Sequence, residues 1–235
     1  MGKTLAIITA RGGSKRIPGK NIKNFLGQPI INYSISAALN SGCFDEVMVS
    51  TDDTRIAVIA KKAGATIPFM RSENTSGDFA TTADVILEVL DEYRKIGLTY
   101  EYCCCIYPTA IFLTAEKLIT AFDKLLITNA ESVIPVVRYS FPIQRSFKIE
   151  NGFVRMNWPE HMNTRSQDLP PAYHDCGQFY FLRTDAFLKT KRLFTDFTIP
   201  YEMPESEVQD IDNEEDWNIA KIKYTFLLEK FKSNV

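Results

Sequence analysis

The fold is decided by the segment TLAIITA at residues 4–10, which runs directly into RGGSKRIPGKN at residues 11–21. Residues 4–10 are short, apolar and rich in β-branched side chains, and this pattern predicts a buried strand. Residues 11–21 leave the carboxyl end of that strand, which is where open α/β sheets bind their ligands. The two segments together predict a strand and a ligand-binding loop of an α/β fold.

Short apolar runs alternate with helix-period segments through the N-terminal two-thirds of the chain. Strands are predicted at residues 4–10, 46–50, 66–69, 102–107 and 132–137, and helices at residues 29–41, 54–63, 82–95 and 114–126. Strands that alternate with helices of crossover length indicate a parallel sheet covered on both faces. The expected fold is therefore a three-layer, mostly parallel α/β domain.

The pattern changes after Arg138. Residues 147–150 and 153–156 flank Asn151-Gly152, which is a strong signal for a tight hairpin, and the polar residues that follow, to Ala172, are irregular. A strand at residues 178–182 and an amphipathic helix at residues 215–231 complete the pattern. No linker or repeat interrupts it, so we expect one domain over residues 1–235, with residues 141–172 as a protruding hairpin and arm.

Composition excludes several classes of partner. The chain has 235 residues, and its 27 basic and 29 acidic side chains give a net charge of −2, so no global basic field is available to hold a nucleic acid. The longest apolar run, residues 102–107, is far shorter than the roughly 20 residues that cross a bilayer. The five cysteines contain no C-x-x-C pair. They are interpreted as small buried side chains of a protein in the reducing cytoplasm. Neither a membrane nor a nucleic acid is therefore expected as a partner.

The loop after the first predicted strand combines flexible backbone with positive charge. Four cations fall within ten residues of a net acidic chain: Arg11, Lys15, Arg16 and Lys20. Glycines nearby allow the backbone to approach a ligand closely and turn its N–H groups inward. Such donors beside arginine and lysine suit a polyphosphate. The alternative, a solvated basic turn, is less consistent with a position directly after a buried strand.

Two familiar phosphate-binding motifs do not fit this loop. The Walker motif needs four residues between its glycines, whereas Gly13 and Gly19 are separated by five, and Asn21 follows the lysine where Ser or Thr is needed. The dinucleotide motif requires glycine where this chain has Ser14. The loop therefore predicts phosphate binding of another kind.

Two pairs of carboxylates are candidates for metal binding or helix capping. Asp210 and Asp212 are two residues apart, so on an extended segment both face the same way and could hold Mg²⁺ against phosphates. Alternatively, they are acidic residues before the last helix, which Asn213 can cap. Asp52 and Asp53 also precede a predicted helix, and for them capping is the favoured interpretation.

Residues 10–21 resemble the nucleotide-binding signature of the CMP-sugar synthetases of nonulosonic (sialic-type) acids. The related Kdo cytidylyltransferases typically carry proline at the position of Asn21. The resemblance covers essentially the whole chain, in order, through VSTD at 49–52, FMR at 69–71, DFATT at 78–82, PT at 108–109, Arg165, QDLP at 167–170, Gly177 and DID at 210–212. It implies a single Rossmann-like nucleotidyltransferase domain with a dimerisation arm.

The resemblance also implies roles for individual residues. Those implied to bind the nucleotide CTP are Arg11, Gly12, Gly13, Ser14, Lys15, Lys20, Asn21, Arg71, Ala80 and Thr82. Asp210 and Asp212 are implied to bind magnesium. We expect Arg11, Lys20 and Asp212 to be catalytic, because placement and charge neutralisation dominate this kind of phosphoryl chemistry.

Several segments depart from the sialic acid members. The chain has YPTA at residues 107–110 where they usually have Gln-Pro-Thr-Ser, and Cys176-Gly177 where they typically have Asn-Gly. The segments FPIQR at 141–145 and YHD at 173–175 look more like the pseudaminic acid branch. Arg165 is implied to pair with the sugar carboxylate, since a guanidinium binds carboxylates in a bidentate manner. The residues expected to contact the sugar are Tyr107, Gln144, Arg165, Tyr173, His174 and Gln178.

The expected function is that of a cytidylyltransferase, which activates a nine-carbon 2-keto sugar acid with CTP to give a CMP-sugar for cell-surface glycans. Pseudaminic acid is the favoured sugar, and N-acetylneuraminic acid, legionaminic acid or Kdo are the alternatives. A nucleotide-binding module that has lost turnover is the non-enzymatic alternative. A homodimer is expected, because residues 141–172 contain too few apolar side chains to form a core of their own.

Overall fold

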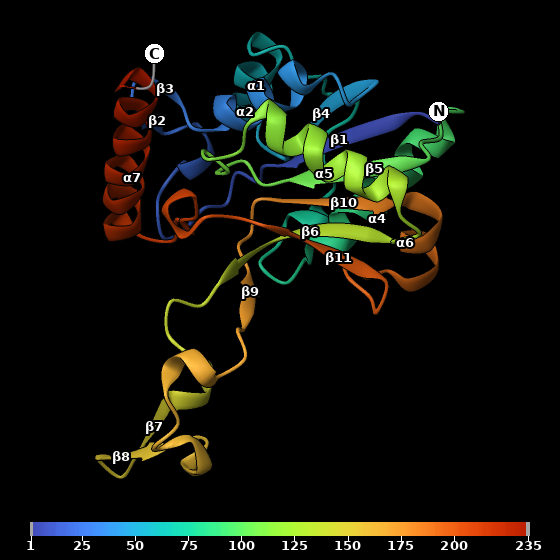
Figure 1. The fold of residues 1–235 in the computed structure, drawn as a ribbon. Helices are drawn as coiled ribbons and strands as arrows, with labels where there is room; N and C mark the ends of the chain where they lie inside the picture. The colour runs from blue at the N-terminus through green and yellow to red at the C-terminus, as the bar shows by residue number, and fades with distance from the viewer. Residues whose placement is uncertain (1, 234–235) are drawn as a thin grey trace.

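The computed structural model describes residues 2–233. Its main sheet contains β1 (Thr4–Thr9), β4 (Glu46–Ser50), β5 (Tyr102–Ile106), β6 (Ser132–Arg138), β9 (Tyr173–Asp175), β10 (Phe179–Arg183) and β11 (Thr198–Glu202). The strand order is β11-β6-β10-β5-β1-β4, and β9 pairs antiparallel with the end of β6 (Figure 1). Strands β4, β1 and β5 are parallel, as are β6 and β11, whereas β10 is antiparallel to both of its neighbours. The predicted mostly parallel sheet is confirmed.

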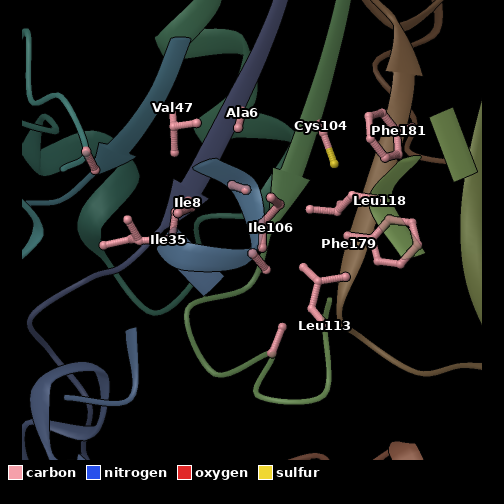
Figure 2. Close-up of a cluster of buried hydrophobic side chains, with 14 of the residues drawn as sticks. Ala6, Ile8, Ile35, Val47, Cys104, Ile106, Leu113, Leu118, Phe179 and Phe181 are labelled. Atoms are coloured by element: carbon pink, nitrogen blue, oxygen red, sulfur yellow. The ribbon is translucent and has the colours of Figure 1, made fainter. Parts of the chain in front are cut away.

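Helices cover both faces of this sheet. The helices of the described residues are α1 (Ile31–Ser41), α2 (Thr54–Lys62), α3 (Glu73–Ser76), α4 (Thr82–Lys95), α5 (Ala115–Ile127), α6 (Thr184–Thr190) and α7 (Glu214–Ser233), of which α7 packs in a separate cluster with Ile17 and Phe25. Helices α1, α2 and α5 pack on one face, where Ile35 and Leu118 belong to the same cluster as Ile8 of β1 (Figure 2). Helices α4 and α6 pack on the other face, where Ile86 and Phe187 belong to the cluster of Ile7. The three predicted layers are therefore confirmed.

The cysteines of β5 follow the alternation of a strand. Cys104 joins the cluster under α1 and α5, whereas Cys103 and Cys105 join the cluster under α4. All three are buried, as is Cys176, and Cys43 is partly buried; none of the five, all within the described chain, forms a disulfide. The prediction that they behave as small core side chains is confirmed for the buried four.

Helix starts agree with the capping residues read from the sequence. Asp53 caps α2 by accepting a hydrogen bond from the Arg55 backbone, whereas Asp52 instead accepts one from the Gly12 backbone. The Asn213 side chain accepts hydrogen bonds from the first backbone N–H groups of α7. Capping is therefore confirmed for Asp53 and Asn213, and it is wrong for Asp52.

The arm projects away from the sheet (Figure 1). Its hairpin pairs β7 (Phe147–Glu150) with β8 (Phe153–Met156), and Asn151 and Gly152 both have positive φ, of 51° and 80°. Positive φ at both central positions is the geometry that the Asn-Gly pair predicts. Strand β9 leads from the arm back to the sheet beside β6.

The remaining elements are short. A ribbon of β2 (Asn24–Phe25) and β3 (Gln28–Pro29) precedes α1, and the 3-10 turns are Lys20–Ile22, Ile143–Arg145, Pro159–His161, Ser166–Asp168 and Glu205–Glu207. The strand predicted at residues 66–69 is wrong, since only Thr66 forms a single bridge to Met48. Within residues 2–233, no helix has both the length and the apolar character needed to span a membrane.

Candidate active site

The basic loop after β1 is held in place from several sides. Ile17 is buried in a cluster with Ile211 and Trp217 of the C-terminal segment. The Asn21 side chain donates a hydrogen bond to the Arg11 carbonyl at 2.9 Å. The loop is thereby fixed at the carboxyl edge of β1.

A close approach explains one of the loop glycines. The Gly12 backbone N–H donates a 2.8 Å hydrogen bond to the carboxylate of Asp52. A Cβ atom on Gly12 would lie only 2.8 Å from Cβ of Asp53, so the space admits no side chain without a shift. Gly12 therefore shapes the loop, while Gly13 has no neighbour within 4 Å of such an atom.

A cavity of about 470 Å³ opens beside this loop, and we call it the nucleotide cavity. Its wall brings together segments from both ends of the chain. Of the residues predicted to bind nucleotide or metal, it is lined by Arg11, Ser14, Lys15, Lys20, Asn21, Arg71, Ala80, Thr82, Asp210 and Asp212. Gly12 and Gly13 are not part of the wall. Nearly all of the predicted groups therefore converge on one space.

An acidic residue that the sequence analysis left without a role faces the loop cations. Arg11 Nη1 donates to Asp78 Oδ1 at 3.1 Å and to the Gly77 carbonyl at 3.0 Å. Lys15 forms an ion pair with the same carboxylate, and these cations lower the pKa of Asp78. Asp78 lies in the DFATT segment, so its position was visible in the sequence, but nothing there indicated its partner.

Lys20 lies between the loop and the acidic pair. Its Nζ donates to the Ile211 carbonyl at 2.6 Å and lies 3.8 Å from Asp212 Oδ1. Burial lowers the pKa of Lys20, and the negative charges of Asp212 and Asp210 oppose that effect. Lys20 thus connects the predicted phosphate loop with the predicted metal ligands.

The acidic pair itself lies in the wall of the nucleotide cavity. Packing around the Asp210 carboxylate raises its pKa, and the negative charge of Asp212 raises it further. Asp212 also forms a 2.7 Å ion pair with Arg16. In the described part of the chain, no group of three histidine, cysteine or acidic residues could hold a metal alone. A cation bound by this pair would therefore need further oxygen ligands, such as water or phosphate.

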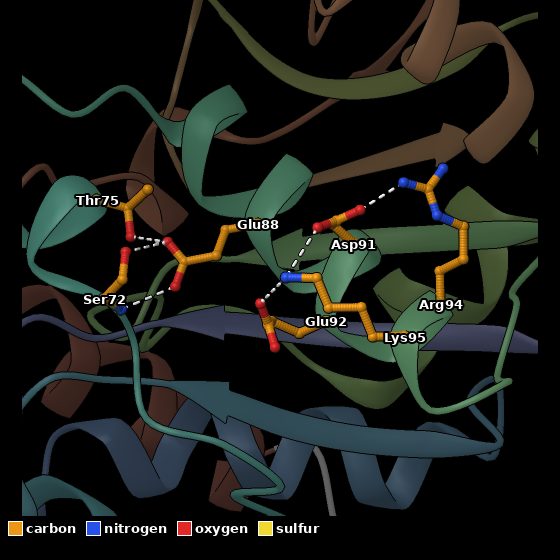
Figure 3. A network of polar contacts seen from close by, with 7 residues as sticks. All are labelled: Ser72, Thr75, Glu88, Asp91, Glu92, Arg94 and Lys95. Carbon is orange, nitrogen blue, oxygen red and sulfur yellow. Dashed lines mark hydrogen bonds and ion pairs between the residues drawn. The ribbon is translucent and has the colours of Figure 1, made fainter.

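Arg71 and its neighbours contribute another part of the wall. The buried Arg71 guanidinium donates to the Ser50 carbonyl at 2.6 Å and to the Ser50 hydroxyl at 2.9 Å, and burial lowers its pKa. Glu88 of α4 then accepts hydrogen bonds from the backbone and hydroxyl of Ser72 and from Thr75 (Figure 3). This network, which we call the Glu88 network, fixes the segment that carries Arg71 against α4.

A second cavity of about 560 Å³ adjoins the first, and Tyr107 and Asp210 line both. We call it the sugar cavity. The Tyr107 hydroxyl is hydrogen-bonded to Thr82 at 3.0 Å, which ties the two spaces together. The His174 ring lies against Tyr139, with centroids 4.7 Å apart. His174 Nδ1 is 2.9 Å from the Asp175 carbonyl, which can only accept, so Nδ1 carries a proton and Nε2 of a neutral ring is an acceptor.

Four predicted sugar contacts line neither cavity within this chain. The Gln178 side chain is buried and donates to the Glu207 carbonyl at 2.8 Å. Arg165 pairs with Asp168 at 2.7 Å, and the others, Gln144 and Tyr173, lie in the arm and at the start of β9. Two cations that the sequence analysis did not assign line the sugar cavity instead: Arg138 and Lys223.

Comparison with known proteins identifies the family of the chain. A family model described as cytidylyltransferase matches residues 5–216. A pseudaminic acid cytidylyltransferase of Campylobacter jejuni is 43% identical over 94% of this chain and 96% of its own length. A CMP-N,N'-diacetyllegionaminic acid synthase of Legionella pneumophila is 29% identical over 93% of this chain and 95% of its own.

Solved structures share the fold. A CMP:2-keto-3-deoxy-manno-octonic acid synthetase complexed with CTP superposes with a TM-score of 0.68 at 17% identity, covering 97% of this chain and 99% of the other. The family model spans most of the chain, and the high-identity relative covers nearly all of it. The chain belongs to the cytidylyltransferase family.

Proposed function

We propose that this protein transfers CMP from CTP to pseudaminic acid and releases pyrophosphate. The observation that carries the proposal is the pair of adjoining cavities that share Tyr107 and Asp210. One is lined by the basic loop and two carboxylates, and the other by polar side chains suited to a sugar acid. The 43% identical relative is a pseudaminic acid cytidylyltransferase, which supports this sugar over the alternatives.

The reaction follows from how the cavities adjoin. The anomeric hydroxyl oxygen forms a bond to the α-phosphorus of CTP, the bond from that phosphorus to the oxygen bridging it to the β-phosphorus breaks so that pyrophosphate leaves, and the hydroxyl proton passes to water. Arg11, Lys15 and Lys20 offset the charge of the phosphates, with Arg11 as a fork and the lysines as point charges. Thr82, Arg71 and Ala80 line the remaining wall, where the nucleoside would lie.

Asp210 and Asp212 fit a magnesium ion by their chemistry. Both are carboxylates in the wall of the nucleotide cavity, and hard cations prefer such oxygen ligands together with phosphates. When bound, Mg²⁺ supplies neutralisation of phosphate charge. The protein's own part is to hold these carboxylates beside Lys20, whose ammonium lies 3.8 Å from Asp212.

The assembly and compartment are part of the proposal. Residues 141–172 would form the dimerisation arm of a single domain over residues 1–235, because the arm leaves large apolar side chains exposed: Phe141, Phe147, Ile149, Phe153 and Val154. A second copy of the chain is the partner that would cover them. Five cysteines without a disulfide suit the reducing cytoplasm.

The test is turnover with a panel of sugar acids. The protein would be incubated with CTP, Mg²⁺ and either pseudaminic, N-acetylneuraminic or legionaminic acid or Kdo, and pyrophosphate release would be followed. We expect pseudaminic acid to give the highest kcat/KM. A higher value for another sugar would refute the sugar assignment, and bound CTP that no sugar consumes would indicate the non-enzymatic alternative.

A further inference from the structure

The chemistry of the proposed substrate fixes where its carboxylate must lie, and the assignment of the residues that bind it rests on the proposed function. In the ring form of a 2-keto sugar acid, the carboxylate and the reacting hydroxyl are attached to the same carbon. The hydroxyl has to face the nucleotide cavity, so the carboxylate lies close to the boundary between the cavities, near Tyr107 and Asp210. A buried or partly buried carboxylate needs a cation or several donors there.

The acidic residues of the sugar cavity are already engaged. Asp175 accepts hydrogen bonds from the Tyr180 hydroxyl at 2.6 Å and from the Gly177 backbone at 2.8 Å. Glu205 accepts one from Ser140 at 2.6 Å. Asp210 is the third carboxylate, which we assign to magnesium. The sugar carboxylate would therefore enter a space where negative charge is present, and its binding depends on the cations of the same wall.

Lys223 of α7 is one of these cations. Its ammonium donates to the Val208 carbonyl at 2.7 Å and to the Glu205 carbonyl at 3.3 Å. Carbonyls fix its position without neutralising its charge, and no carboxylate forms an ion pair with it within residues 2–233. An ammonium has three hydrogens, so one donor remains for a ligand in the cavity.

Arg138 is the other cation. It stands at the end of β6, where it is paired with Tyr173 of β9 in the sheet register. Arg138 lines the sugar cavity and also a smaller cavity at the base of the arm, and among the described residues its side chain has no hydrogen-bond or ion-pair partner. The planar fork of such a group matches a carboxylate in a bidentate manner.

Arg165, the residue that the sequence favoured for this task, is placed differently. Its Nε and Nη2 donate to Asp168 at 2.7 and 3.3 Å, and it lines neither cavity of its own chain. We propose that Arg138 and Lys223 bind the carboxylate of the sugar acid and thereby select acidic sugars. Arg138 acts as the fork and Lys223 as the point charge positioned by two carbonyls.

The experiment measures binding of pseudaminic acid by calorimetry, using protein saturated with Mg²⁺ and a non-hydrolysable CTP analogue, beside turnover with CTP. Arg138→Gln and Lys223→Met remove each charge while keeping a long side chain. Each is expected to weaken sugar binding and raise the sugar KM by about 10- to 100-fold, since a hydrogen bond to a charged group contributes about 1.5–3 kcal/mol. The KM for CTP should stay unchanged.

A matched control is available for each variant. Lys221→Met is the control for Lys223→Met, because Lys221 lies two residues away on α7 and lines neither cavity. Arg192→Gln is the control for Arg138→Gln, because it removes an exposed guanidinium outside both cavities. A second readout is the affinity for the carboxamide of pseudaminic acid, in which a neutral amide replaces the carboxylate. The native protein should prefer the acid over the amide strongly, and the double variant should lose most of that preference.

The outcomes separate this inference from the proposed function. Sugar affinity within twofold of native in both variants would overturn the inference, even if turnover is observed. A loss confined to Arg165→Gln would overturn it too, because the carboxylate would then be bound by an arm. Absence of turnover with every sugar would refute the proposed function, whereas the calorimetric comparison still decides the role of Arg138 and Lys223.

Discussion

The basic loop after β1 and the projecting arm are both polar, but their contacts differ. Side chains of the loop reach distant parts of the same chain, as Lys20 does with Ile211 and Arg11 with Asp78. Contacts of the arm side chains are mostly local, as between Arg165 and Asp168 or Asn157 and Ser146. The loop therefore lines a cavity within one chain, whereas the role that we propose for the arm is contact with a second copy.

The largest effect is expected from Lys20→Ala. This change removes a cation beside the phosphates and should lower kcat by about 10²–10³-fold, as for loss of one preorganised donor at a reacting centre. The measurement is pyrophosphate release at saturating CTP and sugar. Lys61→Ala, an exposed lysine on α2, is the matched control and should retain native turnover. Near-native turnover of Lys20→Ala would contradict the assignment of the loop to phosphate.

Asp212→Asn tests the acidic side of the same site. The amide is a weaker ligand for a hard cation, so kcat should fall by about 10²-fold and higher magnesium concentrations should be required. A magnesium titration of turnover provides the measurement. Glu229→Gln on the exposed part of α7 is the control. If the variant responded to magnesium like the native protein, Asp212 would not be a ligand.

Phe153→Asp tests the arm. Phe153 is 69% exposed, and a charge placed in an apolar contact between copies should weaken self-association by about 30-fold or more. Sedimentation velocity measures this effect. Phe197→Asp, an equally exposed phenylalanine outside the arm, should leave assembly unchanged. If the native protein were a fully active monomer, the proposal that the arm contacts a second copy would be wrong.

The smallest effect is expected from Glu88→Gln, which weakens the Glu88 network behind the nucleotide cavity. Loss of charged hydrogen bonds should cost about 1 kcal/mol, or a Tm decrease of about 2–4 °C for a domain of this size. Glu92 lies on the same helix and is paired with the exposed Lys95, so Glu92→Gln should change Tm less (Figure 3).

The stabilisation by Glu88 should also depend on pH in a predictable direction. Burial would raise the pKa of Glu88, but hydrogen bonds from Thr75 and Ser72 outweigh it and lower the pKa below its ordinary value of 4.5. The carboxylate therefore stabilises the fold above pH 4.5, and this stabilisation is lost as the pH falls through the lowered value. The Tm difference between native and Glu88→Gln protein should shrink in acid. A difference that grew in acid would show that the network does not depend on the carboxylate.

Much of the fold could be predicted because local pattern and final structure agree. The strand at Glu46–Ser50 and the helix at Thr82–Lys95 have the predicted limits, since burial periodicity and caps mark their ends. Strand β11 was missed because Pro200 interrupts its pattern, which is tolerated at an edge strand. Helix α6 was missed because seven residues carry too little periodicity.

The residues of the candidate site also divide into those that the sequence could predict and those that it could not. The loop residues were predictable because glycines and cations are contiguous and follow a buried strand. Arg138 and Lys223 were not, because they are single cations on distant elements that only the folded chain brings to one cavity. The hydrogen bond from the Gln178 side chain to the Glu207 carbonyl was not predictable either, because these residues are 29 positions apart in the sequence.

The most direct test of the central claim is a crystal structure of the protein with CTP and magnesium. We expect the triphosphate in the nucleotide cavity, with Arg11 and Lys20 in contact with its oxygens and Asp78 released from Arg11. CTP bound elsewhere, with Arg11 still paired to Asp78 and Lys20 still on the Ile211 carbonyl, would contradict the account.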